Sequence, residues 1–312
     1  MPAPADRTLV VEVPATSANL GAGFDVLALA LDWTARLEVA PGGRGLRVVP
    51  PAGAPAAWAD PAQNLVARAF ARGWAAAGEP EPPAAELRSL GTLPIGRGLG
   101  SSAAAVVAGL TAAGALSQRP LPPAELLRLA AEFEGHPDNV AAALLGGLTV
   151  AVRHADGTVA PYRVPVRGDL HAVVFLPTRA LDTKAARAVL PSTIPLHDAV
   201  FNAGRCALLV RALLTGDYPS LRTAMEDRWH QPHRTRLLPA LPAVIAAALE
   251  AGADGAALSG AGPSVLALAG APAAGRLEAI ARAMEAAGAG GGLPGAATVT
   301  RPRDRGAVVT WR

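Results

Sequence analysis

The sequence predicts an α+β protein of two lobes, in which helices lie on mainly antiparallel sheets. The first observation is length, because 312 residues exceed a single typical hydrophobic core. The second is the order of patterns, since β-branched and apolar runs of strand length alternate with segments of helical periodicity. The third is that no uninterrupted apolar run reaches the roughly 18 residues of a membrane-spanning helix.

The first half of the chain reads as strands followed by helices. A β-branched run at residues 8–13 is closed by Pro14, and a polar, glycine-rich turn at residues 15–25 separates it from an apolar strand at residues 26–31. A further short strand is expected at residues 46–49. Helices are expected at residues 64–77, 102–116 and 123–134.

The second half predicts helices on a sheet. Strands at residues 148–152 and 169–176 bracket a proposed boundary, which gives an N-terminal domain at 1–165 and a C-terminal domain at 166–312. The tract at residues 285–297 is interpreted as a flexible loop because it is rich in glycine and alanine. Helices are expected at residues 198–214, 218–228, 239–251 and 274–287, and strands at residues 264–270 and 307–311.

Composition argues against several classes of protein. The net charge is only +3, the basic residues are spread along the chain, and aromatic residues make up 4%, so nucleic-acid binding is not expected. The one cysteine, Cys206, allows neither a disulfide nor a cysteine metal site. The start of the chain lacks the pattern of a secretory leader, so we expect a soluble cytoplasmic protein without a membrane partner.

The loop before the helix at residues 102–116 carries the strongest chemical signal. Three alternating glycines precede two serines and a helix start, and glycines without Cβ atoms let backbone N–H groups approach a phosphate. The Walker A pattern fails because Arg97 replaces its lysine, and no dinucleotide-binding glycine pattern occurs there. A flexible turn with an ordinary serine cap is the alternative. The candidate nucleotide-binding residues are Pro94, Gly96, Arg97, Gly98, Leu99, Gly100, Ser101 and Ser102.

Three segments in order resemble the GHMP kinases: residues 13–25, residues 94–102 and residues 257–268. The resemblance covers most of the chain. It implies an N-terminal domain like the second domain of ribosomal protein S5, a C-terminal ferredoxin-like domain, and ATP as phosphoryl donor. It also implies that the third segment braces the phosphate-binding loop through Gly260, Gly262 and Ser264.

Within this superfamily, residues 14–25 and 134–147 resemble the homoserine kinases, although Ala22 and Ala142 stand where that family often has proline. The resemblance implies Mg-dependent phosphorylation of the L-homoserine side-chain hydroxyl to O-phospho-L-homoserine, a step of threonine biosynthesis, and a possible homodimer. The alternatives are a GHMP kinase of the mevalonate or sugar type and a non-catalytic nucleotide-binding relative.

Homoserine is a zwitterion with a primary hydroxyl, so its site needs a cation, an anion and groups that orient the hydroxyl. We expect Arg187 and Arg234 at the carboxylate, Asp25 at the ammonium, and Thr183 beside them. Taken singly, each has a plain interpretation as a turn, helix-start or solvated surface residue. The groups expected near the reacting hydroxyl are Asn19, His136, Asp138 and Asn139, of which Asp138 is either a base or a positioning group, and the expected Mg ligands are Glu134 and Ser101.

Overall fold

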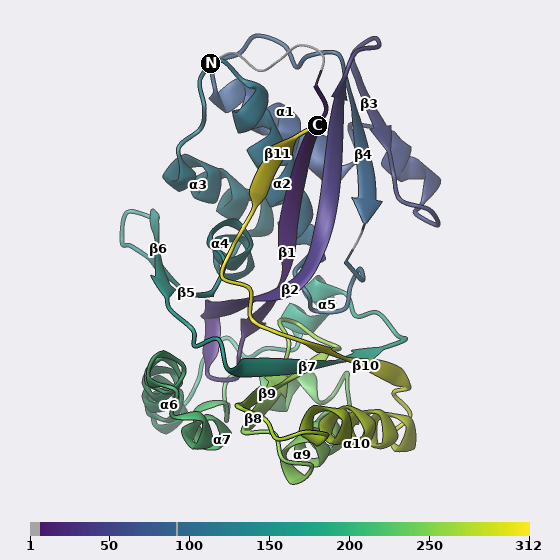
Figure 1. Cartoon of the computed structure of the whole chain (residues 1–312). Helices are drawn as coiled ribbons and strands as arrows, with labels where there is room; N and C mark the ends of the chain where they lie inside the picture. The colour runs from purple at the N-terminus through teal and green to yellow at the C-terminus, as the bar shows by residue number, and fades with distance from the viewer. Residues whose placement is uncertain (1–6, 92) are drawn as a thin grey trace.

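The computed structural model describes residues 7–91 and 93–312; the first six residues, on which the expectation about a leader depends, lie outside this range. Figure 1 places two lobes one above the other, each built on its own sheet. The first sheet has seven strands and the second has four. The described residues also form ten α-helices. The α+β class is therefore confirmed.

Two long antiparallel strands form the spine of the first sheet. The outer half of β2 pairs with β4, and its beginning pairs with β5, so this strand spans both regions of the sheet. β3 runs parallel to β4, while β6 is antiparallel to β5. The strands are β1 (Leu9–Asn19), β2 (Gly23–Pro41), β3 (Leu46–Val49), β4 (Ala85–Gly91), β5 (Leu148–Arg153) and β6 (Val159–Val164).

Four helices accompany this sheet, and the central helix is unusually rich in small residues. A Cβ at Gly109 would collide with the carbonyl oxygen of Val66, so α2 and α1 pack with their backbones close together. The helices are α1 (Leu65–Ala76), α2 (Ser101–Leu116), α3 (Pro123–Glu134) and α4 (Asp138–Leu145), and a 3-10 turn η1 spans Ala56–Ala59.

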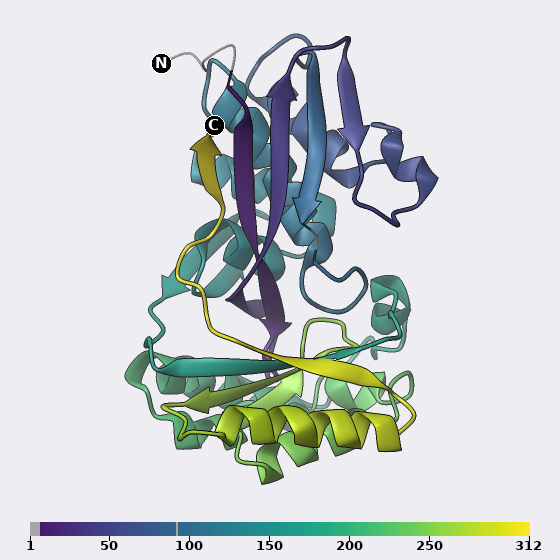
Figure 2. The ribbon, with the colours of Figure 1, turned by 45° about the vertical axis from the view of Figure 1, so that its right-hand side comes forward.

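The second sheet has the antiparallel order β10-β7-β9-β8. Numbered within the lobe, this is the order 4-1-3-2 of a ferredoxin-like fold, and Figure 2 shows helix α10 lying along the sheet. The strands are β7 (Leu170–Pro177), β8 (Gly255–Leu258), β9 (Val265–Gly270) and β10 (Gly295–Thr300). The helical segments are α5 (Thr183–Ala188), α6 (Leu196–Thr215), η2 (Tyr218–Ser220), α7 (Leu221–Ala224), α8 (Gln231–Arg234), α9 (Leu241–Glu250) and α10 (Arg276–Gly290).

The last strand, β11 (Val308–Trp311), leaves the second lobe and pairs antiparallel with β1, opposite the start of the chain. Figure 1 shows this yellow strand beside purple β1. The chain passes from the first sheet to the second between Val164 and Leu170. The division at residue 165 remains a prediction, and β11 belongs by its pairing to the first sheet.

Three segments differ from the expected elements. Residues 15–19 continue β1 instead of forming a turn, because Ala15 to Ala18 pair with β2 while the Thr16 N–H donates to Leu99 O. The helix expected at residues 218–228 ends at Ala224. Most of the tract at residues 285–297 is not a loop, since α10 continues to Gly290 and β10 starts at Gly295. A Cβ at Gly288 would collide with the Phe175 ring, so this glycine allows close packing.

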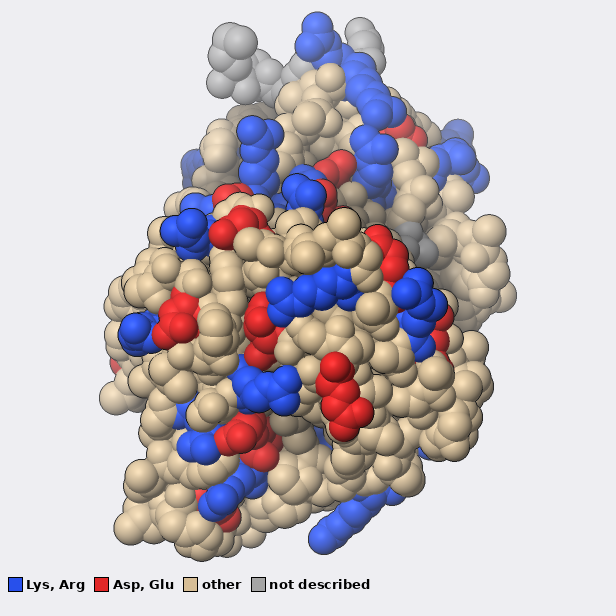
Figure 3. Space-filling view, turned by 60° about the horizontal axis from the view of Figure 1, so that its bottom comes forward, with Lys and Arg blue, Asp and Glu red and all other residues tan. Residues whose placement is uncertain are grey.

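Charges on the underside of the second lobe are of mixed sign, as Figure 3 shows. Lys or Arg side chains are interspersed there with Asp or Glu side chains among other residues. Among the described residues, no helix combines the length and the apolar character that crossing a membrane requires.

Candidate active site

The glycine-rich loop leads directly into helix α2. Gly96, Gly98 and Gly100 all have positive φ angles, 64°, 73° and 65°, and Gly100 is the residue that caps the helix start. The first N–H groups of an α-helix have no partner inside the helix and carry its positive dipole end. Arg97 lies in the same loop, and its buried Nε has no hydrogen-bond partner among the described residues. Loop and helix start together offer donors to an anion.

Two of these glycines are required by the protein's own packing. A Cβ at Gly98 would collide with the carbonyl oxygen of Ser259, and a Cβ at Gly100 would collide with the hydroxyl of Thr16. The sequence argument placed the missing Cβ atoms on the side of the phosphate. In the structure that side is filled by protein, so the loop is clamped between β1 and the segment after β8.

The clamp comes from Ser259, which sequence reasoning did not single out. Its Oγ donates to Gly98 O at 2.6 Å and lies 2.8 Å from Ser17 Oγ. The neighbouring Gly260 donates its N–H to Ala18 O. By contrast, Ser264 is fully buried at the start of β9, and its hydroxyl has no partner among the described residues. The third segment thus lies against the glycine loop at Ser259, Gly260 and Gly262, while the Ser264 backbone carbonyl accepts the N–H of Ser259.

An apolar cavity of about 260 Å³ adjoins the start of α2. Ser101 and Ser102 form its polar edge, and Trp58 and Asn64 reach it from the segment before α1. No motif in the sequence marked these last two residues. Its apolar lining includes Leu37, Val66, Leu93, Ile95, Ala104 and Ala108.

The start of α4 brings three of the predicted polar residues together. His136 Nδ1 lies 2.6 Å from Asp138 Oδ1, which also accepts the N–H of Asn139 at 2.7 Å. Thr16 Oγ1 donates to Asn139 Oδ1 at 2.7 Å, which ties this corner to β1. Burial lowers the pKa of His136, but the hydrogen bond and the charge of Asp138 outweigh it, so the net shift is upward.

Glu134 is bonded to Ser102 rather than to Ser101. The Ser102 hydroxyl donates to Glu134 Oε2 at 2.8 Å, and burial raises the pKa of the Glu134 carboxyl. Carboxylate and hydroxyl oxygens are ligands that a hard divalent cation accepts. A second group of metal-capable atoms, within 4.8 Å of one another, comes from Asp25, His136 and Asp138.

Asp25 and Arg187 form a two-pronged ion pair. Arg187 donates from Nη2 to Oδ1 at 2.7 Å and from Nη1 to Oδ2 at 3.0 Å. Asp25 has a φ of 56° and Asn19 a φ of 70°, values that are costly for residues other than glycine. The Asp25 N–H donates to Asn19 Oδ1, which helps hold this turn. The pair joins the first lobe to α5.

Arg234 is almost completely buried, with 1% of its surface exposed. It forms no ion pair with a carboxylate of the described chain, and instead donates from Nη1 to Gly260 O at 2.9 Å. Its guanidinium and that of Arg187 lie 5.5 and 5.6 Å from the Phe24 ring centre. Burial, and after it the charge of Arg187, lowers the pKa of Arg234 to about 10.

Asn19, Asp25, Arg187 and Arg234 form one connected set. Asn19 Nδ2 donates to the same Gly260 carbonyl that Arg234 uses, which joins the turn after β1 to the second lobe. Thr183 opens α5 as an exposed residue, and no hydrogen bond links its side chain to this set within the described chain. Phe24 and His230, which the sequence argument missed, lie at its centre. Only their position inside the matching segments could have marked them.

Comparison with known proteins gives consistent matches along the chain. The model described as "GHMP kinases N terminal domain" matches residues 64–147, and the model "GHMP kinases C terminal" matches residues 209–290. A homoserine kinase of Gloeobacter violaceus is 47% identical over 263 residues, covering 83% of this chain and 87% of that protein. A homoserine kinase of Synechococcus is 45% identical over 265 residues, 84% of each chain.

A solved structure gives the same match in three dimensions. The crystal structure of homoserine kinase from Cytophaga hutchinsonii superimposes with a TM-score of 0.87 and 32% sequence identity, covering 99% of both chains. The similarity therefore includes both lobes and the order of their strands.

Proposed function

The chain belongs to the homoserine kinases of the GHMP kinase family, and on this basis we propose that its site transfers the γ-phosphoryl group of ATP to the side-chain hydroxyl of L-homoserine. The product is O-phospho-L-homoserine. The chain is accordingly an enzyme, a phosphotransferase that uses ATP. The residue roles below are our assignment.

The observation that carries the substrate assignment is the buried guanidinium of Arg234. A cation taken out of water is costly unless an anion compensates it, and no carboxylate of the described chain pairs with it. We assign that place to the carboxylate of homoserine, with Arg187 as its second cation. The Asp25 carboxylate would accept hydrogen bonds from the ammonium group of homoserine. Asn19 accepts the Asp25 N–H and so helps to hold the Asp25 side chain in place.

The nucleotide is assigned to the glycine loop and the cavity beside it. The phosphates would meet the N–H groups at the start of α2 and the side chain of Arg97, whose buried Nε lacks a partner among the described residues. The base would fill the 260 Å³ cavity, where the lining is mainly apolar and Asn64 and the serines offer polar contacts. The shape of the loop around the phosphates is assigned to the remaining predicted residues, which are Pro94, Gly96, Gly98, Leu99 and Gly100.

Glu134 fits a magnesium site, because its carboxylate is held by Ser102 and its burial favours a nearby cation. We propose Glu134 with the hydroxyls of Ser102 and Ser101 as the residues that would hold the ion. Bound magnesium would supply neutralisation of charge on the phosphate oxygens.

Phosphoryl transfer mainly requires alignment and charge neutralisation, because its transition state is loose. We assign alignment of the homoserine hydroxyl to Asp138, which His136 and the Asn139 N–H hold in place. Burial lowers the pKa of His136, but the hydrogen bond and charge of Asp138 raise it by more, which favours the positively charged form of the ring. Asn139 is fixed by Thr16 and completes the wall that faces the glycine loop.

The cellular setting is also a proposal. We propose that the enzyme works in the cytoplasm as a homodimer, without a nucleic-acid or membrane partner, and supplies a phosphorylated intermediate for threonine biosynthesis. Light scattering of the purified protein tests the assembly.

The test of function is a coupled ADP-release assay with ATP and magnesium. L-homoserine, mevalonate, galactose and shikimate are compared as acceptors by kcat/KM. We expect L-homoserine to be the best acceptor. A higher kcat/KM for mevalonate or galactose would contradict the proposed function.

A further inference from the structure

Arg234 is hydrogen-bonded to a buried histidine, His230, to which the proposed chemistry assigns no role. Its guanidinium donates from Nη1 to His230 Nδ1 at 3.0 Å as well as to Gly260 O, while Nε donates to Ala186 O at 3.3 Å. These contacts within the described residues engage Nε and Nη1, which leaves Nη2 for a ligand. The direction in which Nη2 points therefore depends on what holds Nη1.

The contact with Arg234 determines the tautomer of His230. An arginine has only donors, so Nδ1 must accept and the imidazole proton must lie on Nε2. Nε2 in turn donates to Gly21 O at 2.9 Å. Complete burial lowers the pKa of His230 to about 4. The charge of Asp227 opposes this shift, and the charge of Arg234 adds to it. His230 is therefore neutral at physiological pH, with one acceptor and one donor in fixed places.

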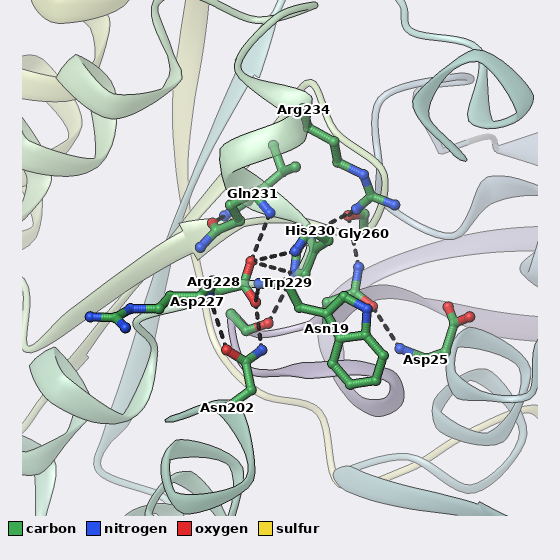
Figure 4. A network of polar contacts seen from close by, with 12 residues as sticks. Asn19, Asp25, Asn202, Asp227, Arg228, Trp229, His230, Gln231, Arg234 and Gly260 are labelled. Carbon is green, nitrogen blue, oxygen red and sulfur yellow. Dashed lines mark hydrogen bonds and ion pairs between the residues drawn. The ribbon is translucent and has the colours of Figure 1, made fainter. Parts of the chain in front are cut away.

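His230 thereby joins Arg234 to the turn that carries the ammonium site. Gly21, the partner of His230, lies in the turn between β1 and β2, between Asn19 and Asp25. Figure 4 shows the bond that joins Asn19 to Asp25. Asn19 and Arg234 also share the carbonyl of Gly260. The contacts close a ring that runs from the turn through His230, Arg234 and Gly260 back to the turn. The positions of cation and anion in the site are thus set together.

Asp227 holds the histidine itself. Its side chain is fully buried and accepts the N–H groups of Trp229, His230 and Gln231 at 2.9, 2.9 and 2.7 Å. Asn202 of α6 donates to the same carboxylate at 2.7 Å. Figure 4 shows these bonds converging on Asp227. The segment before α8 is therefore fixed, and the imidazole plane with it.

We propose that His230 is a positioning residue for homoserine: its neutral Nε2–H tautomer holds the Arg234 guanidinium so that Nη2 faces the substrate carboxylate. This inference rests on the proposed function, in which Arg234 binds that carboxylate. It assigns to His230 a role in substrate affinity and none in ATP binding.

Two substitutions at this position separate its two hydrogen bonds. His230→Asn places an oxygen near the position of Nδ1 and keeps an acceptor for Arg234, whereas His230→Gln places its amide near Nε2 and keeps the bond to Gly21. We expect His230→Gln to raise the homoserine KM about 10- to 100-fold, the range for losing a hydrogen bond to a charged group. His230→Asn should recover most of that loss. His197→Gln, at an exposed histidine on α6, is the matched control.

The test measures homoserine kinetics and ATP binding by calorimetry on each folded variant, and repeats His230→Gln in an Arg234→Met background. If His230 acts through Arg234, the loss should shrink to less than about 3-fold there. An unchanged homoserine KM, an equal loss of ATP affinity, an undiminished loss without Arg234, or failure of both variants to fold would overturn the inference. If the wild-type protein does not phosphorylate homoserine, the proposed function fails, and the inference about His230 fails with it. If the wild type is active but the variants give one of the contrary results, only the inference about His230 fails.

Discussion

At the scale of single residues, Asp25 and Arg187 hold each other much as the two ends of an amino acid would be held. Each has about a third of its side chain exposed, at 33% and 37%, so the pair can be reached from solvent. In the proposed binding mode, the zwitterion replaces both partners at once. A ligand with only one charge frees one side chain and leaves the other unpaired.

This exchange predicts discrimination against ligands that lack one charge. We expect 4-hydroxybutyrate, without the ammonium, and 3-aminopropan-1-ol, without the carboxylate, to lose on the order of 2 to 5 kcal/mol in kcat/KM relative to homoserine. Asp25→Asn should narrow the gap between homoserine and 4-hydroxybutyrate, since the ammonium then gains little. An unchanged gap in that variant would show that the ammonium lies elsewhere.

Arg234 gives a second prediction. Arg234→Leu should reduce homoserine kcat/KM by roughly 2 to 5 kcal/mol of transition-state stabilisation, and lysine should restore only part because it lacks the guanidinium fork. Arg234 is linked to the glycine-rich loop, because it contacts Gly260, whose neighbour Ser259 bonds Gly98.

Calorimetry with ATP is therefore needed beside the kinetics. We expect a small change in ATP affinity and a large change in homoserine use. Normal homoserine kinetics in a folded Arg234→Leu enzyme would remove Arg234 from the site.

The His136–Asp138 contact predicts a pH-dependent contribution to stability. Because the net pKa of His136 is raised, its contribution is fully present below the unfolded pKa, about 6.5, and is lost as pH rises through the folded pKa. Asp138→Asn should remove it. Urea unfolding should show a difference between wild type and variant on the order of 1 to 3 kcal/mol at about pH 5.5, and a smaller one at about pH 9. A difference that grows with pH would refute this interpretation.

At the scale of elements, the glycine-rich loop and the helix that follows it could be predicted from the sequence, whereas the contacts that fix the loop could not. Alternating glycines before a helix start are a local signal. The match of Gly98 with Ser259 depends on residues 161 positions apart, and no local pattern encodes it. For the same reason Asn202 and Asp227, from different elements, went unnoticed until the fold brought them together.

The packed glycines give the prediction at this scale. Gly98→Ala combines a strained φ with a collision against the Ser259 carbonyl, so we expect a loss of roughly 2 to 4 kcal/mol in unfolding free energy together with weaker ATP binding. Gly157→Ala is the matched control, because Gly157 also has a positive φ, 85°, but no described atom lies within 4 Å of the position that its Cβ would take. Its cost should be only about 1 kcal/mol. Equal costs in thermal or urea unfolding would mean that the clamp contributes nothing.

At the scale of the whole molecule, the sequence predicted an α+β chain with two lobes, but not that its last strand would return to the first sheet. The run at residues 307–311 has the composition of a strand, and composition does not name a partner. Only the pairing of Leu9 with Trp311 reveals that β11 covers β1 and is the edge strand of the first sheet.

This edge can be tested with neighbouring substitutions. Val309 packs against the core, while Thr310 is exposed on the other side of the same strand. We expect Val309→Asp to cost about 2 to 3 kcal/mol of unfolding free energy and Thr310→Asp to stay within about 0.5 kcal/mol. Similar losses in both variants, measured by urea unfolding, would argue against β11 as a packed strand.

The returning strand also has a consequence for synthesis on the ribosome. Translation proceeds from the N-terminus, so β1 emerges almost 300 residues before Val308–Trp311 can cover its outer edge. Until β11 has emerged, that edge is an open template for pairing with another nascent chain. The first lobe can therefore become complete only after β11 has emerged from the ribosome and paired with β1.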